Sequence, residues 1–114
     1  MNYTTLSIGN MDYKLRMTTR SMCELEKKLG RNPIDILIET TQNRLPKTTD
    51  LVFILHSALQ PYNHNIKIDD VYDLFDEYIA DGHTYMDFIN VVIELFKVSG
   101  VIRDEKDEGE SPNA

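Results

Sequence analysis

The chain has 114 residues, 41% of them hydrophobic, and a net charge of −7 from 12 lysines and arginines against 19 aspartates and glutamates. This composition predicts one soluble domain, and the negative charge argues against nucleic acid as the main partner, because binding to its backbone depends on clusters of Lys and Arg. The single cysteine excludes an internal disulfide, and no apolar stretch approaches the roughly 20 residues that cross a membrane. The N-terminus lacks the basic start and apolar run of a signal peptide, so we expect a cytoplasmic protein.

A β-hairpin is predicted over residues 3–17, with strands at 3–8 and 13–17 and a slightly long loop between them. The second strand alternates apolar and basic side chains, in the order Tyr13, Lys14, Leu15, Arg16 and Met17. This alternation is typical of a strand with one solvent-exposed face. Two strands alone are only marginally stable, so we expect the hairpin to pack on helices or on another chain.

Five helices follow, each indicated by apolar residues at helical spacing: 19–29, 33–42, 49–60, 69–81 and 85–99. Thr18, Thr19 or Ser21 can cap the first helix, and Gly30 ends it because glycine readily adopts the left-handed conformation. The third helix is apolar on nearly all sides, as a buried central helix is. We therefore predict a mainly α (α+β) domain over residues 1–102, with about five short packed helices and a small N-terminal hairpin, and then a disordered acidic tail over 103–114.

The sequence carries no pattern that indicates catalysis or a metal site. Asp69, Asp73 and Asp76 share a face of the fourth helix, but the spacings of di-iron and calcium sites are absent, so a solvated acidic face is the better interpretation. The three histidines are scattered, and Cys23 has no neighbouring base that would activate it. We expect a protein that is not an enzyme, with no catalytic residues and no cofactor.

Two features point to binding of a partner protein. The first is a basic group on the hairpin and first helix that includes Lys14, Arg16 and Arg20. It is either an ordinary solvent-exposed face or a docking patch for an acidic surface on a partner. The second is the fifth helix, whose apolar arc is wide enough either to pair with the third helix in the core or to be covered by a partner helix or by self-association. The candidate partner-binding residues are Lys14, Arg16, Arg20, Phe88, Val92, Leu95 and Phe96.

Most of the chain, over residues 13–100, also resembles a known family. The segment KLRMTTRSMCELEKKLGRNP is similar to the opening of the tail assembly chaperones of long-tailed, siphovirus-type bacteriophages and prophages, which commonly read as a basic strand, L-T-T-R or similar, and then E-K-K-L-G-x-N-P. The likeness continues at residues 54–60 and 70–78 and in the closing helix that ends Val98-Ser99-Gly100. Its specificity lies in the order and spacing of these segments.

The resemblance implies a cytoplasmic binding protein, absent from the mature virion, that keeps the long helical tape measure protein soluble and recruits tail tube subunits. Many such chaperones gain a second domain by a ribosomal frameshift, and the tail after Gly100 is where it would join. Two other classes stay open. One is a structural tail or head–tail component that self-assembles into a ring through the hairpin edge. The other is an acidic regulator that mimics nucleic acid, against which the basic group weighs.

Overall fold

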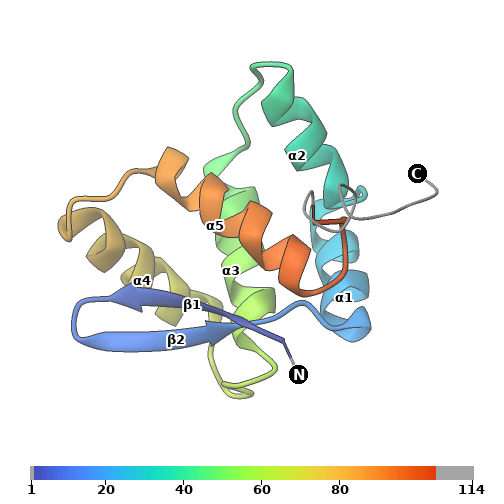
Figure 1. The fold of residues 1–114 in the computed structure, drawn as a ribbon. Helices are drawn as coiled ribbons and strands as arrows, with labels where there is room; N and C mark the ends of the chain where they lie inside the picture. The colour runs from blue at the N-terminus through green and yellow to red at the C-terminus, as the bar shows by residue number, and fades with distance from the viewer. Residues whose placement is uncertain (1, 105–114) are drawn as a thin grey trace.

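The computed structural model describes residues 2–104, which form a two-stranded antiparallel hairpin and five helices (Figure 1). The elements in chain order are β1 (Thr4–Ile8), β2 (Met11–Leu15), α1 (Thr19–Leu29), α2 (Ile34–Thr41), α3 (Thr48–Leu59), α4 (Ile68–Ala80) and α5 (Tyr85–Val98). The predicted mainly α fold with a small N-terminal hairpin is confirmed, and each helix begins and ends within one residue of its predicted bounds. Most of the predicted acidic tail, residues 105–114, lies outside the described residues.

The hairpin turn is shorter than predicted. Ile8 pairs with Met11, so the loop consists of Gly9 and Asn10 alone, and β2 begins earlier than expected. Gly9 has a φ of 60° at the first central position of this loop, where a type II′ turn requires a positive φ. The prediction of a longer loop was therefore wrong, because a glycine at this position allows two residues to join the strands.

Local capping bonds explain why the helix bounds were readable from the sequence. The Ser21 N–H donates to Thr18 Oγ1 at 3.0 Å and starts α1, and Gly30 ends it with a φ of 72°. At α5 the Asp87 N–H donates to Thr84 Oγ1 at 3.1 Å, while the Thr84 N–H donates to the Asp87 carboxylate at 2.8 Å. Such reciprocal bonds satisfy N–H groups that have no partner within the helix.

Helix α3 is the centre of the core, as its apolar circumference predicts. It packs against α1, α4, α5 and β2, and Figure 1 shows α5 crossing in front of it with α1 and α4 on opposite sides. Leu51, Ile54, Leu55 and Leu59 of α3 are all buried. The other elements therefore pack their buried apolar faces around a single shared core.

The hairpin is fixed to the helical body at both ends. The Arg16 N–H donates to the Ala58 carbonyl at 3.1 Å, and the Met17 N–H donates to Ser99 Oγ at 2.8 Å, which joins the end of β2 to α3 and to the end of α5. At the other end, the Gly9 N–H donates to an Asp81 carboxylate oxygen at 2.6 Å, just beyond α4. With Leu6, Ile8 and Leu15 buried beneath it, the hairpin packs on its own helices.

An ion-pair cluster holds α2 to α3. Arg31, in the loop before α2, lies 2.6 Å from a Glu39 carboxylate oxygen and 3.2 Å from an Asp50 oxygen. The hydrogen bond from Arg31 lowers the pKa of Glu39 below its ordinary value of 4.5. Ile36 and Leu37 supply the buried face of α2.

Candidate partner-binding surfaces

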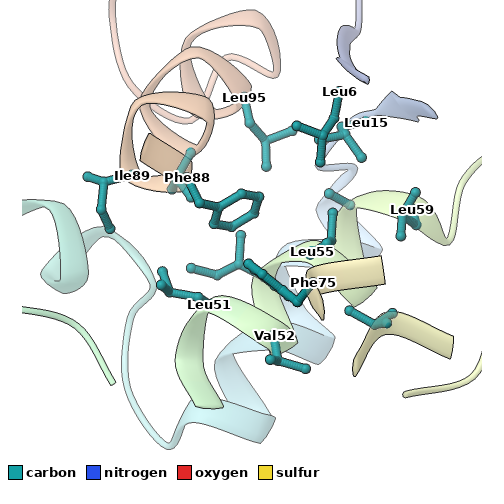
Figure 2. Packing of buried hydrophobic residues seen from close by; sticks show 14 of the residues in the cluster. Leu6, Leu15, Leu51, Val52, Leu55, Leu59, Phe75, Phe88, Ile89 and Leu95 are labelled. Atoms are coloured by element: carbon teal, nitrogen blue, oxygen red, sulfur yellow. The ribbon is translucent and has the colours of Figure 1, made fainter. Parts of the chain in front are cut away.

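The predicted apolar surface of α5 is part of the core. Phe88, Val92, Leu95 and Phe96 are each 0% exposed. Figure 2 shows the Phe88 ring pointing from α5 into the core, and it meets the Phe75 ring of α4 with centroids 4.9 Å apart. These four side chains therefore have no free surface to offer a partner, contrary to the prediction, because α3, α4 and the hairpin already cover the arc.

The three basic residues predicted to bind a partner, Lys14, Arg16 and Arg20, differ in how exposed they are. Arg16 is half-buried and its Nη1 donates to the Asn2 carbonyl at 2.7 Å, so this side chain holds the N-terminal segment. Its Nε is buried and makes no hydrogen bond to another described residue. Lys14 and Arg20 are exposed, on β2 and α1 respectively. A partner could reach Lys14 and Arg20, but only part of Arg16.

Lys14 lies over two exposed tyrosines, Tyr3 and Tyr62. We call these two tyrosines the hairpin tyrosine pair. The Lys14 Nζ is 4.9 Å from the Tyr3 ring centroid and 5.8 Å from that of Tyr62. The two rings meet edge to face at 6.1 Å. Because each ring already has an aromatic neighbour and a cation, this group is largely satisfied by the chain itself.

Arg20 belongs to a separate hollow of about 620 Å³ between α1 and the end of α3. Glu24, Gln60, Pro61 and His64 also line this hollow. The carboxylate of Glu24 offsets the charge of Arg20, so the hollow presents mixed polar groups and no concentrated positive patch.

A second pair of exposed tyrosines surrounds a pocket that the sequence did not reveal. Tyr72 of α4 is 49% exposed and Tyr85 of α5 is 42% exposed, and both line a pocket of about 140 Å³. The buried side chains Val52 and Phe75 lie beneath, and Asp76 lies at the rim. We call this site the tyrosine pocket. Its one sequence signal is an aromatic residue at position 72, within the polar face of α4.

His56, His83 and the buried Tyr78 contact other parts of the chain. His56 contacts Lys28 Nζ at 3.1 Å and the Ile66 carbonyl oxygen at 3.0 Å. Tyr78 stacks on His83 with ring centroids 4.4 Å apart. Burial raises the pKa of the Tyr78 phenol above its ordinary value of 10.0, and the negative charge of Asp87 raises it further. Within residues 2–104, no three His, Cys, Asp or Glu side chains gather closely enough to hold a metal ion.

These features define a small, mainly α protein that carries two pairs of exposed tyrosines on its surface. The chain belongs to the family of unknown function DUF6096, whose model matches residues 2–113. No curated protein and no solved structure matches it. None of the helices in the described part of the chain is both long and apolar enough to pass through a membrane.

Proposed function

We propose that this protein is a non-enzymatic tail assembly chaperone of a long-tailed bacteriophage or prophage. It binds the tape measure protein in the host cytoplasm, keeps it soluble and helps recruit tail tube subunits. The observation that carries the proposal is the resemblance over residues 13–100, which runs in order from β2 to the end of α5.

The surface of the molecule supports this proposal on physical grounds. A long helical protein exposes apolar faces before it is sheathed, and such faces aggregate unless another protein covers them. Tyr72 and Tyr85 provide exposed aromatic surface beside a pocket, on a chain whose net charge of −7 favours solubility of a complex. The apolar arc of α5 plays no part in this argument, since it fills the core.

Co-expression with the tape measure protein from the same genome tests the proposal. We expect the tape measure protein to be insoluble when expressed alone and to co-elute with this chain on size-exclusion chromatography when both are expressed. If the tape measure protein stays insoluble and this chain elutes alone as a defined ring, the proposal fails in favour of a self-assembling structural component.

A further inference from the structure

We infer that the tyrosine pocket receives an apolar side chain from an amphipathic helix of the tape measure protein, with Lys or Arg beside that side chain on the helix. The inference rests on the proposed function and adds to it a binding surface and the chemistry of the segment bound.

The size of the pocket fits one side chain. Its volume is about 140 Å³, close to the ~150 Å³ of a protein cavity that holds a benzene ring. Val52 and Phe75 form an apolar floor, and Tyr72 and Tyr85 are half-exposed walls that an entering group would cover. An anchor side chain that enters a pocket between aromatic residues is the usual arrangement of an energetic hot spot in a protein interface.

The charge around the pocket selects a basic segment. Helix α4 contains five carboxylates and no lysine or arginine. Within residues 2–104, the side-chain carboxylates of Asp69, Asp73 and Asp76 form no hydrogen bond or ion pair, and Asp76 itself lines the pocket. Lys47, just before α3, is the nearest base along the chain to the residues that line the pocket. Free carboxylates beside an apolar pocket are complementary to an apolar residue flanked by Lys or Arg at helical spacing.

A second copy of this chain fits the pocket poorly. In a two-fold dimer the same surface meets itself, so the unpaired carboxylates of one α4 would face those of the other. Like charges placed opposite each other in an interface disfavour association. The basic segment of another protein avoids this repulsion.

The hairpin tyrosine pair provides a matched control on the same molecule. Tyr3 and Tyr62 are 44% and 37% exposed, close to the values for Tyr72 and Tyr85. They differ in having Lys14 over their rings, so a basic segment would meet a positive charge there. Removing either pair deletes the same chemical groups from surfaces of opposite charge.

The experiment measures binding of overlapping fluorescent tape measure peptides, each of about 25 residues, or nearly 40 Å as a helix. Anisotropy titrations compare the wild-type chain with the double variants Tyr72→Ala/Tyr85→Ala and Tyr3→Ala/Tyr62→Ala, with circular dichroism as the check on folding. For the tightest peptide, we expect the first variant to raise Kd at least about tenfold and the second to change it by less than about twofold. We also expect that peptide to carry Lys or Arg within a helical turn of an apolar residue.

The outcomes separate the inference from the proposed function. If wild-type chain and tape measure protein co-elute but the Tyr72→Ala/Tyr85→Ala variant binds every peptide as well as wild type, the inference is wrong and the chaperone proposal stands. A loss confined to the Tyr3→Ala/Tyr62→Ala variant also overturns it and moves the site to the hairpin. If the wild-type chain binds no tape measure segment and does not co-elute, both fail together.

Discussion

Two pairs of exposed tyrosines lie on this molecule in opposite electrostatic surroundings. At the hairpin, Tyr3 and Tyr62 contact each other beneath Lys14. At the other site, Tyr72 and Tyr85 line a pocket beside the acidic outer face of α4, and none of the described cations lies over their rings. Exposure alone does not distinguish the pairs. What distinguishes them is whether the chain itself supplies the neighbour that an aromatic ring favours.

The two tyrosine pairs differ in whether a cation of this chain lies over their rings. A cation over an exposed ring contributes about 0.5–1 kcal/mol, so the hairpin pair already gains this from Lys14. The tyrosine pocket lacks it, and the carboxylate of Asp76, which lines the pocket, is also unpaired within the described residues. A basic, apolar partner therefore gains more at the tyrosine pocket than at the hairpin.

The largest effect is expected from removing the ring that supports the tyrosine pocket from inside. Phe88 is 0% exposed and packs against Phe75, which forms part of the pocket floor. We expect Phe88→Ala to lower the free energy of unfolding by about 3–5 kcal/mol, because it deletes a buried aromatic side chain and leaves a cavity. Urea unfolding followed by circular dichroism measures this.

The control for this prediction is Tyr85→Ala, which removes a half-exposed ring from the same helix. We expect a much smaller loss of stability from it. Equal losses from the two variants would contradict the assignment of Phe88 to the core and Tyr85 to the surface.

The sequence predicted those parts of the fold that depend on neighbouring residues. Thr18 and Gly30 fix the ends of α1, and the Thr84–Asp87 pair starts α5, through bonds made within a few residues. Of the two alternatives open for the apolar arc of α5, the structure has packing in the core and not a partner surface. Periodicity could not decide between them, because it shows which side chains are apolar and not how many elements cover them. Phe88 is covered in part by Phe75 and Tyr78 of α4, which the folding of one helix against the other brings next to it.

The candidate site was harder to predict for a related reason. Tyr72 and Tyr85 are on different helices, and the pocket exists only because α4 and α5 meet beside the start of α3. The basic group was visible as a pattern, but its division into Arg16, which holds the N-terminal segment, and the exposed Lys14 depends on tertiary contacts.

A smaller effect is expected at the turn on the hairpin side. Gly9 has a φ of 60°, where a side chain costs about 1–2 kcal/mol, and an added Cβ would lie 2.6 Å from the Glu77 Oε1. We therefore expect Gly9→Ala to lower the free energy of unfolding by about 1–2 kcal/mol, since the end of the Glu77 side chain can move aside. Gly30→Ala is the matched control, because it has a similar φ of 72° with open space around the added Cβ. Denaturation should show a loss from both variants and at least as large a loss at Gly9, because the first central position of a type II′ turn favours glycine. No loss at Gly9 would contradict the turn geometry.

The free energy of unfolding is expected to depend on pH through Tyr78, on the buried face of α4. The pKa of Tyr78 is raised above 10.0 by burial and then by Asp87, so the folded protein favours the neutral phenol. Stability from this group is complete below pH 10 and falls as the pH rises through the folded pKa. Urea unfolding at several pH values on either side of 10 should show this fall, and Tyr78→Phe should reduce it. An unchanged slope in Tyr78→Phe would show that other groups cause it.

The smallest effect is expected from Lys14. Replacing it with methionine keeps an apolar stem over Tyr3 and Tyr62 but removes the charge. We expect Lys14→Met to lower the free energy of unfolding by about 0.5–1 kcal/mol, as for an exposed cation over a ring. A loss that disappears in the Tyr3→Ala/Tyr62→Ala background would assign it to the rings, and an unchanged loss would contradict the contact.

The most direct test of the account is the amount of soluble tape measure protein recovered on co-expression with three forms of this chain. We expect recovery with the wild-type chain and with Tyr3→Ala/Tyr62→Ala, and a marked loss with the folded variant Tyr72→Ala/Tyr85→Ala. Equal recovery with all three would contradict the tyrosine pocket as the binding surface. Failure of the wild-type chain to keep the tape measure protein soluble would contradict the chaperone function itself.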